Sequence, residues 1–128
     1  MKTKNLIILL LMSITTQAQQ FVGDWKGALD VQGMKLEIIF HIAQKDNAYA
    51  TTMDVPMQGA SGIAIEKTEI TNNTITLRAP QMGIEFIGEL KNQQITGEFH
   101  QAGMNLPLTL SAFENKLPGD TTLPSTKE

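Results

Sequence analysis

Alternation of apolar and polar residues is the feature that most constrains this chain. Every second residue is apolar in segment 36–42, and a similar period returns in 84–90, 95–99 and 106–110. A period of two is typical of half-buried antiparallel strands, because successive side chains of a strand point to opposite faces. No convincing apolar pattern of helical spacing follows residue 18. The chain is therefore predicted to be all-β.

Eight strands are expected, near 22–31, 34–44, 49–55, 63–70, 74–79, 84–90, 94–100 and 105–113. Their short connections favour an up-and-down meander, and their regular spacing suits a small antiparallel β-barrel. The fourth strand has the weakest pattern. Ile63 and Ile65 share one face whereas Ile70 falls on the other. A β-bulge in that strand is the expected explanation.

The turns between these strands fall into two classes. The first, third, fifth and seventh, at 32–33, 56–62, 80–83 and 101–104, carry Gln, Gly and Met, and the other three, at 45–48, 71–73 and 91–93, are polar and rich in asparagine. Alternate turns of a meander lie at opposite ends. The first class is thus predicted to form one mouth, with the 56–62 loop as a lid. Its candidate residues are Met34, Met57, Gln58, Met82, Gln101 and Met104.

Two interpretations of this methionine-rich end remain open. Methionine is flexible and polarizable, and is common at adaptable binding surfaces. The same side chains could instead fold over and plug the barrel. Gly27, Gly88 and Gly97, all expected to face inward, also have two interpretations. They either make room for large neighbours such as Trp25 and Phe99 and for tight coiling of the barrel, or leave an empty cavity.

The motif Gly23-Asp24-Trp25 on the first predicted strand resembles the calycins, the lipocalin and avidin barrels. In that family the tryptophan closes the end of the barrel opposite the ligand mouth. The resemblance implies that Trp25 has a structural role at the asparagine-rich end.

A broader resemblance covers about 20–113. The segments GDWKGAL, LEIIFHI, MDVPMQGASGI, EFIGEL and ITGEFHQAGMNLPLTL resemble the non-catalytic β-domain that precedes secreted α/β-hydrolases of Bacteroidetes-type bacteria. The Pro-x-Gln-Gly and Gln-x-Gly patterns of that family match Pro56 to Gly59 and Gln101 to Gly103. In that family a hydrolase follows the β-domain, whereas here residues 114–128 follow. The resemblance implies an accessory module with a hydrolase as partner.

The two ends of the chain lack the strand pattern of its middle. Lys2 and Lys4, a short apolar run and Thr16-Gln17-Ala18 are typical of a secretory signal peptide, so residues 1–18 are expected to be removed. Residues 19–113 are expected to form the barrel domain, and 114–128 a flexible tail. The apolar run is too short to span a membrane. The protein is thus expected to be secreted or periplasmic, with no membrane span after cleavage.

Composition excludes several classes of function. Loss of Lys2 and Lys4 would move the net charge from −3 to −5, which argues against partners that need basic patches, namely nucleic acids and anionic membranes. The absence of cysteine excludes zinc–thiolate sites, cysteine nucleophiles and disulfides. The core alone must then stabilise the domain.

No catalytic or metal site is expected, and no cofactor. Ser61 lies in Gly59-Ala60-Ser61-Gly62, which lacks the spacing of a nucleophile elbow. His41 and His100 fall on polar strand faces with no carboxylates patterned around them, so both are predicted to be solvated. The protein is therefore expected to be a non-catalytic module. Either it binds a small apolar ligand or an apolar peptide end at the mouth, or it docks a secreted hydrolase or a second copy of itself.

Overall fold

The computed structural model describes residues 20–113, which form one antiparallel sheet. Its strands are β1 (Gly23–Val31), β2 (Met34–Lys45), β3 (Ala48–Val55), β4 (Ala60–Ile65), β5 (Lys67–Thr71), β6 (Thr74–Ala79), β7 (Ile84–Lys91), β8 (Gln94–Gln101) and β9 (Met104–Phe113). Two short 3₁₀ turns, η2 (Pro56–Gln58) and η3 (Pro80–Met82), connect β3 to β4 and β6 to β7. The proposed signal peptide and tail lie outside the described residues. None of the described residues belongs to a helix that is long and apolar enough to cross a membrane.

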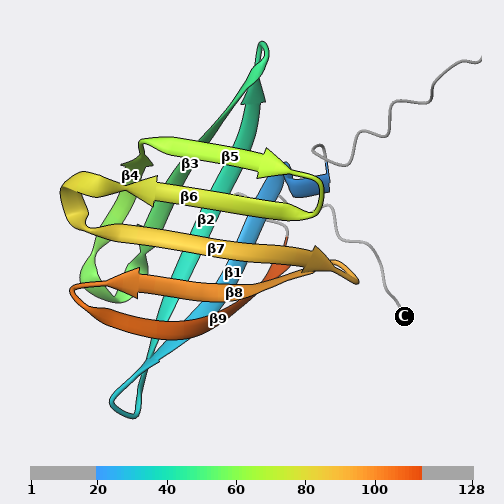
Figure 1. Cartoon of the computed structure of the whole chain (residues 1–128). Helices are drawn as coiled ribbons and strands as arrows, with labels where there is room; N and C mark the ends of the chain where they lie inside the picture. The colour runs from blue at the N-terminus through green and yellow to red at the C-terminus, as the bar shows by residue number, and fades with distance from the viewer. Residues whose placement is uncertain (1–19, 114–128) are drawn as a thin grey trace, which may run out of the picture.

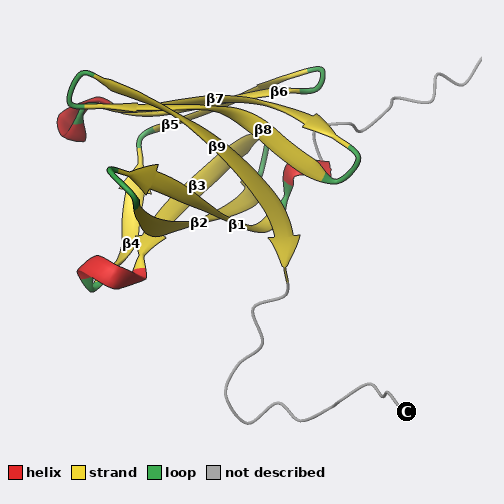
Figure 2. Ribbon diagram, turned by 90° about the horizontal axis from the view of Figure 1, so that it is seen from below, coloured by secondary structure: helices red, strands yellow, loops and turns green. Residues whose placement is uncertain are grey.

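The sheet curls into a nearly closed barrel. Its strand order is β4-β3-β2-β1-β9-β8-β7-β6-β5, so β1 pairs with β9 and the two edges are β4 and β5. Figure 1 shows β5 to β9 crossing in front of β1 to β3, and Figure 2 shows the two groups as facing layers. The prediction of an all-β antiparallel barrel is confirmed.

The prediction of eight strands is wrong, because the expected fourth strand is two strands. β4 pairs with β3 and β5 pairs with β6, and only Glu66 separates them. The chain turns a corner at Glu66, which resets the alternation and lets both Ile65 and Ile70 pack against the core. The bulge expected in this strand lies earlier. Ser61 and Gly62 together oppose the single residue Asp54, so the expected 56–62 lid is a short turn followed by the first residues of β4.

The barrel interior is filled by hydrocarbon. The side chains of Phe21, Phe40, Phe86, Ile38, Ile75, Leu77, Ile95, Leu108 and Leu110 are fully buried. The rings of Phe40 and Phe86, one from each layer, lie 5.9 Å apart between centroids. Packing of this kind is typical of a barrel just wide enough for its own side chains.

The inward glycines mark close packing. A Cβ at Gly97 would lie 1.9 Å from the carbonyl oxygen of Ile87, and one at Gly27 would lie 2.3 Å from that of Thr109. At Gly88 the neighbours are the side chains of Ile95 and Phe86, at 2.7 Å. The cavity interpretation of these glycines is therefore wrong, because the space beside each one is occupied.

The turns separate by end as the sequence pattern predicts. The connections β1–β2, β3–β4, β6–β7 and β8–β9 lie at one end of the barrel, on the left and at the bottom of Figure 1. This end, formed by 32–33, 56–59, 80–83 and 102–103, is called the methionine end. The remaining tight turns, at 46–47, 72–73 and 92–93, define the asparagine end.

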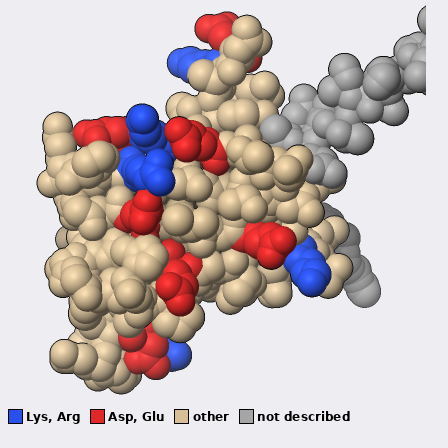
Figure 3. Space-filling view, in the orientation of Figure 1, with Lys and Arg blue, Asp and Glu red and all other residues tan. Residues whose placement is uncertain are grey.

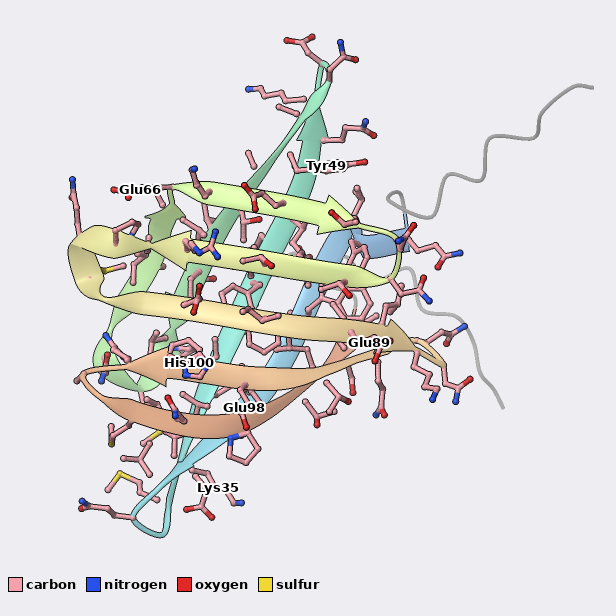
Figure 4. The ribbon with its side chains drawn as sticks, viewed as in Figure 1. Lys35, Tyr49, Glu66, Glu89, Glu98 and His100 are labelled. Atoms are coloured by element: carbon pink, nitrogen blue, oxygen red, sulfur yellow. The ribbon has the colours of Figure 1, made fainter. Side chains whose placement is uncertain are left out.

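The outer face of the β5–β9 layer is polar. Figure 3 shows acidic side chains spread across it, with a basic group between them. Arg78 on β6 bonds Glu85 at 2.7 Å and approaches Glu69 at 3.7 Å. Glu89 and Glu98 also stand on this face in Figure 4. These residues keep the exposed side of the sheet hydrated.

Candidate functional site

Two turns of the same shape frame the methionine end. Pro56-Met57-Gln58-Gly59 and Pro80-Gln81-Met82-Gly83 both form a 3₁₀ turn. In each, a proline occupies the first turn, where its fixed φ suits the geometry. A left-handed glycine follows, with φ of 67° and 65°, and its N–H donates to the proline carbonyl at 2.9 and 3.0 Å. The backbone of the two turns is thus set by proline and glycine, and the middle residues are free to differ.

Glutamine and methionine exchange places between these turns. The third position lines a pocket at the barrel end, and it is Gln58 in one turn and Met82 in the other. The second position is exposed, and it is Met57 in one turn and Gln81 in the other. One methionine and one glutamine therefore face the pocket, and one of each faces solvent.

The pocket at the methionine end is small and mostly apolar. It has a volume of about 110 Å³. Its apolar lining comprises Leu29, Leu36, Ile38, Met53, Val55, Ile63, Met82, Ile84 and Phe99, and Gln58 and Gln101 add two amides. The side-chain amide of Gln101 donates to the carbonyl of Met82 at 3.4 Å, so this glutamine helps to hold the η3 turn beside the pocket.

The four methionines of the turns are exposed. Their exposed fractions are 59% for Met34, 61% for Met57, 37% for Met82 and 42% for Met104. Met53, the nearby methionine on β3, is buried. In Figure 4 the yellow sulfur atoms lie on the left and lower left, beside the methionine end. Of the six residues predicted for the mouth, Gln58, Met82 and Gln101 line the pocket, whereas Met34, Met57 and Met104 are exposed at the strand ends and in the turn beside it.

The asparagine end holds a larger hollow, of about 750 Å³, where the calycin resemblance implied only a structural tryptophan. Asp24, Trp25, Asn73, Lys91, Asn92 and Phe113 are among its lining residues. Trp25 itself is only 3% exposed, and its indole N–H donates to the carbonyl of Phe21 at 2.8 Å. Trp25 thus packs into the core beneath this hollow.

A charged cluster on the outer face of β1 to β3 was missed from the sequence. His41 Nδ1 lies 2.7 Å from Asp24 Oδ1, and His41 Nε2 lies 2.8 Å from Asp54 Oδ2. Asp24 is the cross-strand partner of His41 on β1, and Asp54 lies diagonally across on β3. The three side chains are between 23% and 29% exposed. The prediction of a solvated His41 without carboxylate partners is therefore wrong.

The geometry of this cluster favours the charged form of His41, with both ring nitrogens beside carboxylates. Ionised carboxylates only accept hydrogen bonds, and a histidine donates from both ring nitrogens only as imidazolium. Burial lowers the pKa of His41, but hydrogen bonds to Asp54 and Asp24 and the two negative charges outweigh it, so the pKa is raised above its ordinary value. Partial burial raises the pKa of Asp54, but bonds from His41 and from the Gly62 N–H outweigh it, so this pKa is lowered.

The other candidate residues for chemistry stand apart. His100 on β8 bonds the side chain of Asn105 and lies 3.9 Å from Glu98, and Figure 4 shows it on the outer face of the barrel. Ser61 is exposed on β4. Within 20–113 no group of three or more His, Cys, Asp or Glu residues is arranged to hold a metal ion.

Comparisons with protein-family models, curated proteins and solved structures find no match to this chain. The resemblances to the hydrolase-associated β-domain and to the calycins therefore stay predictions.

Proposed function

We propose that this protein is a secreted or periplasmic, non-catalytic docking module whose methionine end binds an extended apolar segment of a partner protein. The observation that carries the proposal is the combination of a filled barrel interior with four exposed methionines beside one small apolar pocket. One apolar side chain of the partner would enter the pocket, and the methionines would cover the residues around it.

The size of the pocket favours a single side chain as its ligand, because a lipid or another large apolar molecule would not fit. Pockets for drug-sized ligands have volumes of about 300–1,000 Å³, and a dry cavity of about 150 Å³ holds one benzene. The volume of about 110 Å³ at the methionine end suits a single aliphatic side chain. A small apolar solute of similar size is the second candidate ligand.

The chemistry of the end supports an uncharged peptide. Methionine side chains adapt their shape to a partner and bury apolar area on contact. The amides of Gln58 and Gln101 beside the pocket offer donors and acceptors to a peptide backbone. The pocket lining includes no charged side chain, so a charged residue that entered the pocket would lose hydration without gaining a partner. Asp30 and Lys35, beside the β1–β2 turn, pair with each other at 3.5 Å.

The partner named by the sequence resemblance is a secreted hydrolase. Contact with such an enzyme would need an exposed apolar surface, and the methionine end has four exposed methionines beside an apolar pocket. Docking to a hydrolase is thus the specific form of the proposal. Self-association through the same end is an alternative.

The test uses displayed ten-residue peptides as probes. Peptides are selected on the exported protein, and their contacts are mapped by NMR on methyl-labelled methionines. We expect the selected peptides to be apolar and to shift the methyl signals of Met34, Met57, Met82 and Met104. The control variant is Ile87→Gln, which removes an exposed apolar residue on the outer face of β7 and should leave binding unchanged.

Replacement of Met34, Met57, Met82 and Met104 by Gln should abolish peptide binding because it removes the apolar rim. Thermal stability should stay within a few degrees, since surface substitutions usually change stability by about 0.5 kcal/mol or less each. Unfolding of this variant would identify the methionines as core plugs. A folded variant that still binds would place the docking site elsewhere. Binding of benzene-sized solutes without any peptide would favour the second candidate ligand.

A further inference from the structure

We propose that Asp24, His41 and Asp54 form a proton-operated clasp that holds the β3–β4 turn, and that the charge of His41 thereby controls the shape of the methionine-end pocket. The inference rests on the proposed function only where it predicts an effect on docking. The control of the turn itself is tested without any ligand.

The clasp is connected to the pocket through one carboxylate. Asp54 Oδ2 bonds His41 Nε2 at 2.8 Å, and Asp54 Oδ1 accepts the N–H of Gly62 at 2.8 Å. Asp54 and Gly62 stand on either side of segment 55–61, which contains the η2 turn. Val55 and Gln58 from this segment line the pocket. A displacement of the Asp54 carboxylate therefore moves one wall of the pocket.

This turn needs the carboxylate because its strand ladder is interrupted. The register between β3 and β4 shifts between Met53 and Val55, where Ser61 and Gly62 together oppose Asp54. A bulge leaves a residue without its ladder partner. Asp54 bonds the N–H of Gly62, which has a left-handed φ of 66°. The side chain thus supplies a hydrogen bond at the point where the regular ladder is broken.

The matching turn between β6 and β7 has no such requirement. Its ladder runs without a shift up to the pair Ala79 and Ile84, directly beside the turn. Its 3₁₀ geometry is otherwise the same as that of η2. The structure thus contains an internal control, a turn of equal shape whose position does not depend on Asp54.

The state of the clasp depends on one proton. As imidazolium, His41 donates to both Asp24 and Asp54. A neutral ring has a single N–H. One of the two carboxylates then faces the lone pair of the other ring nitrogen and receives no hydrogen bond from it. If the bond to Asp54 survives, it changes from a charge-assisted bond to a weaker one. Deprotonation therefore weakens the hold on Asp54 in either tautomer.

Few other groups contribute to this titration. Asp24 and Asp54 are the charged groups within ion-pair distance of His41 in the described chain. The next charges along the same face of β1 and β2, Lys26 and Glu37, pair with each other at 3.8 Å. The other facing residues are uncharged, namely Thr52 on β3, Gly62 and Ala64 on β4 and Phe113 on β9. The raised pKa of His41 agrees with a ring held by two carboxylates.

The experiment is an NMR titration of the exported protein from about pH 5.5 to pH 9, a range that brackets the ordinary histidine pKa of about 6.5. It follows the His41 ring, the amides of Gly59 and Gly62, and the amide of Gly83 in the η3 turn. We expect Gly59 and Gly62 to shift with the midpoint of His41, and Gly83 to stay constant. His41→Gln should remove the transition at Gly62. A Gly62 amide that stays constant while His41 titrates, or that still titrates in the variant, would overturn the clasp. The native titration decides the matter even if the variant fails to fold.

Peptide affinity measured over the same pH range separates the clasp from the docking proposal. If both hold, a peptide selected on the methionine end binds several-fold more weakly above the pKa of His41, and the effect disappears in His41→Gln. Affinity that is independent of pH would refute control of docking and leave docking intact. If no peptide binds while Gly62 titrates with His41, the docking proposal fails and control of the turn is supported.

Discussion

Trp25 is the single tryptophan of the chain, and its environment is that of a core residue. The ring is 3% exposed and donates its N–H to Phe21 at 2.8 Å. Trp25→Ala should lower the free energy of unfolding by about 3–5 kcal/mol, as expected for loss of a buried aromatic side chain. Trp25→Phe should lower the free energy of unfolding by less, because it keeps an aromatic ring in the core. It still loses the hydrogen bond to Phe21. Urea unfolding followed by circular dichroism measures both values. A loss below about 1 kcal/mol for the alanine variant would be typical of an exposed site.

His41 makes stability depend on pH. Because its pKa is raised in the folded state, its contribution is complete below its ordinary pKa of about 6.5 and is lost as pH rises through the raised value. The pKa of Asp54 is lowered in the folded state. The contribution of Asp54 to stability is therefore present above its ordinary pKa of about 3.8 and is lost as pH falls through the lowered value. His41→Gln should thus be most destabilising between these two ordinary values. The expected loss is about 1 kcal/mol, since the cluster is partly exposed to solvent.

Urea unfolding of the native and His41→Gln proteins at pH 5.5 and pH 9 tests this dependence. The difference between the two proteins should shrink at the higher pH. An equal difference at both values would show that the loss arises from packing alone. His100→Gln is the matched control, because His100 lies on the outer face of β8 and is more exposed than His41.

At the scale of elements, the barrel is weakest where β4 meets β5. Within residues 20–113 each of these strands pairs along one side only. A side-chain hydrogen bond at 2.8 Å connects Thr68 on β5 to Thr51 on β3, the strand next to β4. Strand regions with few hydrogen bonds open locally at lower free energy. Amides of β4 and β5 should therefore exchange with deuterium faster than those of residues 24–26 of β1, which pair with both β2 and β9.

Hydrogen exchange followed by NMR checks this order. If the amides of β4 were protected as well as those of β1, the edge would be covered in solution by another segment or by a second copy. Repeating the measurement at several protein concentrations separates these two cases, because only the second copy makes protection depend on concentration.

At the scale of the whole molecule, the proposal of a secreted or periplasmic protein predicts a processed chain. Cleavage after Ala18 would give an exported form that starts at Gln19. The intact mass of the exported protein measures this directly. A form that retains Met1 would contradict the signal-peptide prediction. The first described strand begins at Gly23, so such a cleavage would leave all strands of the described barrel intact.

Local signals in the sequence were sufficient for the strands and the two ends of the barrel. Apolar alternation depends only on the geometry of an extended chain, so segments such as 36–42 and 84–90 were placed correctly in β2 and β7. Turn residues act equally locally, because proline and glycine set the backbone of η2 and η3 whatever surrounds them. The all-β barrel and the grouping of the methionine turns followed from these two signals.

Only the tertiary structure decided the features that depend on contacts between distant strands. The corner at Glu66 exists because β4 pairs with β3 and β5 pairs with β6. The sequence of neither strand indicates which strand it pairs with. The space beside Gly97 is filled by the backbone of β7, so whether a glycine leaves a cavity depends on the neighbouring strand. The Asp24–His41–Asp54 cluster requires the register of three strands at once. Alternation alone says that these side chains face outward, and a shift of pairing by one residue would have separated them.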